Sequence, residues 1–285
     1  KPRSRSAMRE ASSARISVSP WQSITGGGSG IGRAIAERFA KGGWFVGIGD
    51  IDEKGMIETQ HLVGLGFSFG HMFDVRDRDA WDEALNAFST AAGGRIDVVA
   101  NNAGIPLGGT IDQNSVAEIE RCLDINLKGV LFGAQAALPH LQKTAPGSCL
   151  LNTASAAGIY GTSGASVYSA TKFGVRGMSE SLDAEWSPDG IKVAAIMPSF
   201  IETPLLDHAP NRASNESVRE RVKQAGLELT PVEDVAQAVW DAVHGDDLHV
   251  VVGKTARQLR FAARWMPGQM RKVARGRAGG AMGGH

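Results

Sequence analysis

Tyr168 and Lys172 lie four residues apart in a Tyr-Ser-Ala-Thr-Lys segment. On an α-helix, side chains at i and i+4 share a face, so this spacing would hold a phenol beside an ammonium. A neighbouring positive charge favours the phenolate, and we expect it to lower the pKa of Tyr168 from its ordinary value of about 10. A tyrosine tuned in this way can exchange a proton with a hydroxyl or carbonyl oxygen. The pair alone is weak evidence, because solvated helices also carry Tyr and Lys at this spacing.

A glycine-rich turn earlier in the chain could hold a phosphate group. Residues 25–32 read Thr-Gly-Gly-Gly-Ser-Gly-Ile-Gly and lead into a predicted helix, Ile31 to Lys41. Glycines let backbone N–H groups approach a pyrophosphate, and the helix N-terminus adds a favourable dipole. Asp50 ends the next predicted strand, where a carboxylate can accept hydrogen bonds from an adenosine ribose. Asp50 could instead cap the helix that starts near Asp52, and Asp52 could itself be the ribose partner.

Short apolar runs alternate with amphipathic segments along the chain. The runs predict buried strands over residues 44–48, 96–100, 149–152, 192–196 and 249–252. The amphipathic segments predict helices, such as Arg78 to Ala91, which Gly93 and Gly94 would end. This repetition predicts a single-domain α/β fold, a doubly wound parallel sheet with helices on both faces. Pro20 to Ile24 is a poor candidate for the first strand, because proline and two polar residues do not suit a central position.

The composition is that of a globular domain without a strong field. The 285 residues carry 30 Lys and Arg against 30 Asp and Glu, so net charge gives no argument for nucleic acid binding. No apolar run reaches the ~18 residues of a membrane span. Cys122 and Cys149 lie in apolar surroundings and predict buried free thiols in a reducing compartment, the cytoplasm. None of the seven histidines has metal-ligand spacing, so we expect no metal site.

Both ends of the chain differ from its middle. Residues 1–20 are rich in Ser and Arg, with Glu10 the only acid, and predict a disordered or processed leader before a domain over residues 21–253. Residues 254–285 form a basic amphipathic extension without an acid. Its interleaved apolar residues include Leu259, Phe261, Trp265 and Met266. It could contact a membrane surface or an acidic partner, but the simpler interpretation is a helix that packs on the domain or on a neighbouring subunit.

Taken together, these motifs resemble the short-chain dehydrogenase/reductase family over roughly residues 24–253. The glycine turn has the family's Thr-Gly-x-x-x-Gly-x-Gly spacing, and Tyr168 and Lys172 match its Tyr-x-x-x-Lys pair. Further family motifs stand in order: Asp74-Val75, Asn101-Asn102-Ala103-Gly104, Asn126, Ser155 and Pro198 to Thr203. Where the family has Pro-Gly, this chain has Pro198-Ser199. The resemblance implies a Rossmann-type fold.

The resemblance also implies reversible hydride transfer between a nicotinamide dinucleotide and a secondary alcohol or ketone. In this interpretation Tyr168 exchanges a proton with the substrate oxygen, and Ser155 orients that oxygen. Lys172 holds the nicotinamide ribose, and Asn126 positions a water that links Lys172 to solvent. The implied cofactor contacts are Gly26, Ser29, Gly30, Ile31, Gly32, Asp50, Asp74, Val75, Asn102, Ala103, Gly104, Tyr168, Lys172, Pro198, Ile201 and Thr203.

Charge at the adenosine end favours NAD over NADP. Asp50 would repel a 2′-phosphate, Ser29 stands where family members that use NADP commonly carry Arg or Lys, and no basic residue directly follows Asp50. Residues 200–230 correspond to the family's variable substrate lid and predict a moderately apolar alcohol, with steroid, sugar, acyl and xenobiotic substrates left open. The resemblance implies a homodimer or homotetramer built through the helix that bears Tyr168 and the preceding one. The alternatives are an NADPH-dependent ketoreductase and a non-catalytic dinucleotide-binding regulator.

Overall fold

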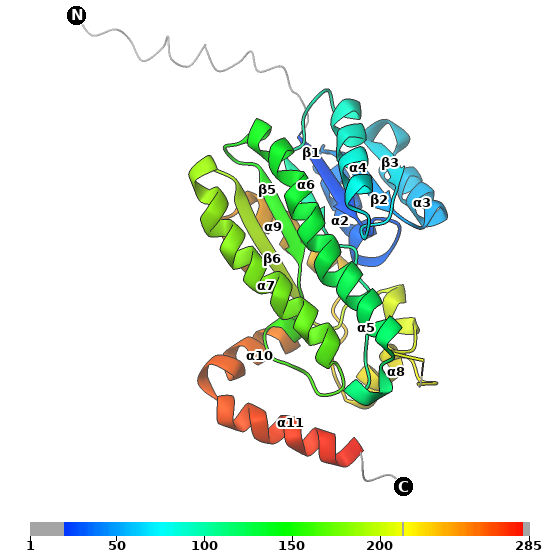
Figure 1. The fold of residues 1–285 in the computed structure, drawn as a ribbon, viewed down its shortest axis with the longest axis vertical. Helices are drawn as coiled ribbons and strands as arrows, with labels where there is room; N and C mark the ends of the chain where they lie inside the picture. Colours follow the sequence, from blue (N-terminus) through cyan, green and yellow to red (C-terminus); the bar gives the residue numbers. More distant parts are fainter. Residues whose placement is uncertain (1–19, 213, 282–285) are drawn as a thin grey trace, which may run out of the picture.

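The computed structural model describes residues 20–212 and 214–281, so the predicted leader lies outside the described residues except for Pro20. In this part of the chain, seven parallel strands form one sheet in the order β3-β2-β1-β4-β5-β6-β7 (Figure 1). The strands are β1 (Trp21–Thr25), β2 (Phe45–Asp50), β3 (Ser68–Met72), β4 (Val98–Asn101), β5 (Cys149–Thr153), β6 (Lys192–Pro198) and β7 (His249–Val252). The predicted doubly wound Rossmann-type sheet is confirmed.

Helices cover both faces of this sheet and bury a core on each. One face carries α2 (Gly30–Lys41), α3 (Glu53–Val63) and α9 (Val232–His244). The other face carries α4 (Arg78–Ala91), α6 (Gly129–Thr144) and α7 (Ser166–Trp186). Ile24 and Phe39 are fully buried on the first side, and Leu85 and Leu150 on the second. Both predicted cysteine thiols are free and buried.

The remaining helices and turns complete the described chain. The helices are α5 (Val116–Leu123), the π-helical stretch η3 (Asp124–Lys128), α8 (Val218–Gln224), α10 (Lys254–Trp265) and α11 (Pro267–Ala281). The 3₁₀ turns are η1 (Leu65–Phe67), η2 (Ile111–Gln113), η4 (Ala156–Gly158), η5 (Ser187–Asp189) and η6 (Pro204–Asp207). Within residues 20–212 and 214–281, no helix combines the length and apolarity that crossing a bilayer requires.

The first strand is better formed than its sequence suggests. All five residues of β1 are buried, and the strand pairs with β2 and with β4. The ring of Trp21 stacks on that of Phe45 with centroids 3.6 Å apart. The backbone N–H of Trp21 donates to the Asp97 carboxylate at 2.9 Å. Pro20 lies just before the strand, where its missing N–H costs no ladder bond. Pairing on both sides therefore outweighs the polar side chains of Gln22 and Ser23.

Strand polarity places the loops that carry the predicted site at one edge. In a parallel sheet all carboxyl ends lie together, so the segments that follow Thr25, Asp50, Asn101, Thr153 and Pro198 meet there. The loops after the strands lead into the N-termini of the covering helices. The first backbone N–H groups of those helices have no partner within the helix. The carboxyl edge is therefore where the predicted motifs converge.

Candidate active site

The glycine turn between β1 and α2 has a shape that only glycine permits. Gly26 and Gly30 adopt left-handed backbone angles, with φ of +66° and +50°. A Cβ on Gly32 would stand 2.0 Å from the carbonyl oxygen of Gly26. Ser29 is the N-cap of α2 but makes no side-chain cap bond, so the first N–H groups of the helix have no side-chain acceptor from it. This tight, donor-rich turn fits the pyrophosphate of a dinucleotide.

Asp50 is held against that turn at the end of β2. Its carboxylate accepts hydrogen bonds from the backbone N–H of Gly28 at 2.8 Å and of Asp52 at 3.0 Å. Asp52 itself occupies the N-cap position of α3, so Asp50 is not the cap of that helix. Asp50 is thus the carboxylate tied to the glycine turn, where the adenosine ribose is expected.

Arg33 secures the other side of the same peptide. Its guanidinium donates to the carbonyl of Gly28 at 2.5 Å, to the carboxylate of Glu58 at 3.1 Å and to the hydroxyl of Thr59 at 3.0 Å. The Gly28 peptide is therefore clamped, with its N–H on Asp50 and its carbonyl on Arg33.

The loop after β4 packs onto the glycine turn through Thr25. The hydroxyl of Thr25 accepts from the N–H groups of Asn102 at 3.1 Å and Ala103 at 3.2 Å. The amide of Asn102 donates back to the carbonyl of Thr25 at 3.1 Å.

The loop after β6 contacts the glycine turn through Thr203. A Cβ added to Gly30 would stand 3.3 Å from the methyl carbon of Thr203. Pro198 ends β6, and Ile201 is buried and pairs with Thr230. The structure thus brings these predicted cofactor contacts to one edge.

Tyr168 and Lys172 share a face of α7, as the spacing predicts. The ammonium of Lys172 lies 5.6 Å from the centre of the Tyr168 ring and donates to the carbonyl of Thr153 at 2.8 Å. The hydroxyl of Ser155 lies close enough to the phenol to lower its pKa, and it accepts from the N–H of Ala157 at 3.2 Å. Ser155 is the N-cap of η4, so the strand end and the helix start bring hydroxyl and phenol together.

The expected fall in the pKa of Tyr168 is wrong for this structure. Loss of solvation raises the pKa of the phenol above its ordinary value, while the hydrogen bond with Ser155 opposes that rise. Lys172 is also buried, and burial lowers its pKa to about 8. Desolvation of both groups therefore outweighs the attraction that sequence spacing suggested, and Lys172 directs its ammonium at a carbonyl.

Asn126 joins the helix side of the site to the loop after β4. It lies in the π-helical stretch η3, and its amide accepts from the N–H of Ile105 and donates to the carbonyl of Ile105, both at 2.8 Å. A Cβ on Gly104 would stand 3.3 Å from the Asn126 amide oxygen and 3.6 Å from the Lys172 ammonium. Asn126, Gly104 and Lys172 therefore meet, with Asn126 anchoring the loop. Its predicted water contact stays a prediction.

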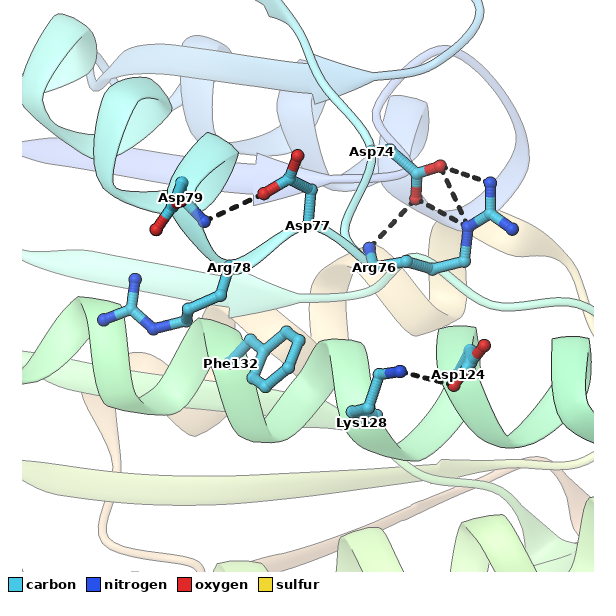
Figure 2. Close-up of a pocket in the computed structure, with 8 residues that line it drawn as sticks. All are labelled: Asp74, Arg76, Asp77, Arg78, Asp79, Asp124, Lys128 and Phe132. Carbon is cyan, nitrogen blue, oxygen red and sulfur yellow. Dashed lines mark hydrogen bonds and ion pairs between the residues drawn. The ribbon is translucent and has the colours of Figure 1, made fainter.

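Asp74 lies apart from the predicted catalytic side chains. Its carboxylate makes a two-pronged ion pair with Arg76, at 2.5 Å for the shortest contact, which lowers the pKa of Asp74 (Figure 2). Figure 2 shows the surface pocket of ≈ 660 Å³ that they line, with Asp124 and Lys128 paired across it. This pocket is not the substrate site, because it contains none of the predicted catalytic residues. Val75 uses its carbonyl to accept from the indole of Trp81 at 3.0 Å.

The structure adds residues that the sequence interpretation did not select. They are Thr25, Arg33, Cys122 and Thr153. Arg33 carried a usable signal, since a cation in the first turn of a helix opposes the helix dipole and calls for a specific partner. Cys122 carried none. Its sulfur accepts from the Asn126 amide at 3.5 Å, and burial raises its pKa to about 11. Among the described residues, no three His, Cys, Asp or Glu side chains cluster as metal ligands would.

Comparison with known proteins agrees with this geometry. The family model described as short chain dehydrogenase matches residues 21–213. The chain is 31% identical to meso-2,3-butanediol dehydrogenase of Serratia marcescens, over 81% of this chain and 89% of that protein. It is 36% identical to 3-alpha-(or 20-beta)-hydroxysteroid dehydrogenase of Mycobacterium tuberculosis, over 66% of this chain and 71% of that protein.

Solved structures show the same similarity. The 3-ketoacyl-(acyl-carrier-protein) reductase of Brucella melitensis, solved with NADH, superposes with a TM-score of 0.72 at 27% identity, covering 82% of this chain and 96% of that one. The matched region contains the glycine turn, Asn126, Ser155, Tyr168 and Lys172. This chain therefore belongs to the short-chain dehydrogenase/reductase family and is an NAD(P)-dependent oxidoreductase that acts on CH–OH groups.

Proposed function

We propose that this chain is an NAD(H)-preferring dehydrogenase that interconverts a moderately apolar secondary alcohol and its ketone. The observation that carries the proposal is the complete set of Ser155, Tyr168 and Lys172, in which Ser155 lies close to the phenol and the Lys172 ammonium lies 5.6 Å from the centre of its ring. A non-catalytic dinucleotide-binding regulator would have no need for this complete set. The set lies at the same sheet edge as the glycine turn, which lets one dinucleotide reach both.

Each side chain has a role that follows from its position. The nicotinamide, when bound, accepts or supplies the hydride. Ser155 donates a hydrogen bond to the substrate oxygen, and Tyr168 takes the hydroxyl proton in oxidation or returns it in reduction. Lys172 is near enough to Tyr168 to hold the nicotinamide ribose with its ammonium. Asn126 keeps the loop after β4 in place and positions the water that links Lys172 to solvent.

The preference for NAD is supported by the groups around the Gly28 peptide. A 2′-phosphate beside Asp50 would meet a carboxylate that two backbone N–H groups already fix. Arg33 is the nearby cation that could compensate, but it is engaged by Glu58, Thr59 and the carbonyl of Gly28. NADP would therefore have to displace existing contacts, whereas NAD places two ribose hydroxyls against an acceptor.

The substrate class is supported by the apolar side chains of the segments near the catalytic edge. Leu107, Ile159 and Leu206 are buried in these segments. The lid closes onto the loop after β4 through hydrogen bonds from the Asn211 amide to the Gly108 carbonyl at 2.7 Å and from the Gly108 N–H to Pro210 at 2.8 Å. The similar proteins are named for a butanediol and for hydroxysteroids, and both of these compounds are secondary alcohols. Apolar side chains in these segments favour an apolar alcohol over a charged sugar.

Replacing Tyr168 tests the reaction. Tyr168→Phe removes the proton-exchanging hydroxyl, and we expect turnover of a panel of secondary alcohols with NAD to fall by about 10²–10⁴-fold. Affinity for NADH, measured by fluorescence titration, should stay near that of the unmodified chain. Tyr160→Phe is the matched control, because Tyr160 is the chain's other tyrosine. Full turnover by Tyr168→Phe would show that another group exchanges the proton.

Titration with NADH and NADPH tests the cofactor preference separately. We expect NADH to bind at least about tenfold more tightly, because only NADPH places a phosphate beside Asp50. Equal affinities, or tighter NADPH binding, would favour the alternative of an NADPH-dependent ketoreductase. Tight NADH binding without turnover of any alcohol or ketone would instead favour a regulator.

A further inference from the structure

Helix α10 has apolar side chains on two different faces. Ala256 is buried, and Leu259 and Ala263 pack against the core beside β7, so one face holds the helix to the domain. Phe261 and Trp265, four residues apart, lie on another face with exposed fractions of 61% and 66%. The simpler interpretation from sequence is a stripe packed on the domain or on a neighbouring subunit, and packing on the domain accounts for only one face.

The exposed aromatic face belongs to a strongly cationic segment. Residues 254–285 contain eight Lys and Arg and no Asp or Glu. The cations with described side chains are all exposed, and no ion pair between described residues uses any of them: Lys254, Arg257, Arg260, Arg264, Arg271, Lys272 and Arg275. We call residues 254–275 the basic arm. Because the whole chain has 30 Lys and Arg and 30 Asp and Glu, the residues outside the basic arm carry a net negative charge equal in size to the positive charge of the arm.

The basic arm leaves the domain at the edge where the site lies. Helix α10 follows the carboxyl end of β7 directly and packs against η4, the turn that Ser155 caps. Figure 1 shows α11 turning after α10 and running beneath the lower ends of α7 and α5. Helix α10 and the turn η4 that Ser155 caps therefore lie at the same edge of the sheet.

We propose that the basic arm docks this enzyme on the surface of an anionic lipid bilayer. Arginine and lysine are drawn to anionic headgroups, and Phe and Trp settle at the boundary between headgroups and acyl chains. Because the acidic remainder lies beyond the arm, and surface charges are screened within about 8–10 Å, local attraction at the arm prevails over repulsion of the domain. Docked in this way, the catalytic edge faces the bilayer, where a moderately apolar alcohol would accumulate. Docking itself does not depend on the proposed reaction.

A second copy of the chain fits the arm less well. Two arms facing each other would bring like charges together around the arm's four described exposed large apolar side chains: Phe261, Trp265, Met266 and Val273. Reversible adsorption to a charged surface needs only a few apolar anchors supported by cations.

Vesicle binding by the full-length chain tests the role of charge. Co-sedimentation would compare phosphatidylcholine vesicles with vesicles that also contain about 30% phosphatidylserine, at about 0.15 M salt. We expect clear preference for the anionic vesicles, lost at high salt, and a loss on the order of 100-fold in Arg257→Gln/Arg260→Gln/Arg264→Gln. The matched control removes three exposed cations elsewhere: Lys41, Arg121 and Lys143. The control should bind like the unmodified chain.

The aromatic pair is tested in the same assay. Phe261→Ser/Trp265→Ser should weaken binding to anionic vesicles by about tenfold or more, because both side chains lose their place at the headgroup boundary. Leu65→Ser/Phe67→Ser removes equally exposed apolar groups at the other end of the sheet and should change nothing. NADH titration of every variant reports whether the domain is folded.

Three outcomes would overturn the proposal. One is equal binding, or none, to the two kinds of vesicle. Another is a loss of binding in the control variants as large as in the arm variants. The third combines two results: the unmodified chain does not bind vesicles, and sedimentation velocity shows a changed oligomeric state in the arm variants. Together these results would show that the arm contacts a second copy of the chain. NADH binding and turnover of a water-soluble alcohol stay intact in all three, so these results are separate from failure of the proposed reaction.

Discussion

At the scale of single residues, we expect the Ser155 hydroxyl to influence the pH at which Tyr168 works. Burial raises the pKa of Tyr168, and the Ser155 hydroxyl is the group that lowers it. Alcohol oxidation needs the phenolate as base, so its rate should rise with pH toward the pKa of Tyr168. Ser155→Ala removes the lowering contact, and we expect the rising limb of kcat for oxidation to move to higher pH, with lower kcat throughout. The measurement is a pH profile with NAD in excess.

The reverse reaction supplies the matching check on this prediction. Ketone reduction needs the protonated phenol, so its falling limb should also move to higher pH in Ser155→Ala. Ser163→Ala, in the exposed loop before α7, is the control and should leave both limbs in place. A limb that stays put or moves to lower pH in Ser155→Ala would mean that Ser155 does not tune the phenol.

The positions of these groups are predictable from the sequence, but the direction of their pKa shifts is not. Tyr168 and Lys172 could be paired from spacing alone, because helix geometry is local. The direction of the Tyr168 pKa could not, because the segments that remove water from it come from distant parts of the chain. The first-turn position of Arg33 indicates that it needs a partner, but not which one, since Glu58 lies on the next helix.

At the scale of elements, the Gly28 peptide couples the glycine turn to β2 and α2. Its N–H binds Asp50 and its carbonyl binds Arg33. Arg33→Met should free this peptide and weaken NADH binding by about tenfold, as expected for loss of one charged hydrogen bond. Arg33→Lys should recover part of the affinity. Fluorescence titration measures both, and kcat at saturating NAD should stay nearly constant, since Arg33 is far from Tyr168 in the site. An unchanged affinity in Arg33→Met would show that the turn holds its shape without the clamp.

Strand β1 carries an uncommon defect that can be repaired. Gln22 is 1% exposed, and neither its amide oxygen nor its amide nitrogen has a hydrogen-bond partner in the described structure. A buried amide without partners costs about 1–3 kcal/mol, so Gln22→Met, which keeps the length and removes the polar atoms, should raise the free energy of unfolding by about that much. Urea denaturation measures the change.

The opposite substitution sharpens this test. Gln22→Glu has the same shape but places a carboxyl in the core, and we expect it to lower the free energy of unfolding by several kcal/mol. If Gln22→Met were as unstable as Gln22→Glu, the amide would have partners after all, and packing would decide the effect.

Element boundaries were predictable where local signals are strong. Arg78–Ala91 matches the expected helix at both ends, because Asp77 caps its start and Gly93 and Gly94 close its end. The first strand was misjudged because its stability comes from β2 and β4, which local pattern does not report. The π-helical stretch around Asn126 was equally hidden, since its extra residue is set by the contact with Ile105.

At the scale of the whole molecule, α6 and α7 leave apolar side chains uncovered in a single chain. Leu131 on α6 is 45% exposed and Phe173 on α7 is 42% exposed. Helices α6 and α7 run side by side on one face of the molecule (Figure 1). Exposed apolar groups on adjacent helices favour an isologous contact with a second copy, which supports the proposed homodimer or homotetramer.

This contact can be broken without touching the catalytic side chains. Leu131→Asp/Phe173→Asp would bury four carboxylates in a two-fold interface, so we expect sedimentation equilibrium to show the 30.0 kDa monomer where the unmodified chain forms a dimer or tetramer. Leu65→Asp/Phe67→Asp, at the β3 end of the sheet, carries the same charge and should leave the assembly intact. An unmodified chain that sediments as a monomer would show that these helices remain exposed.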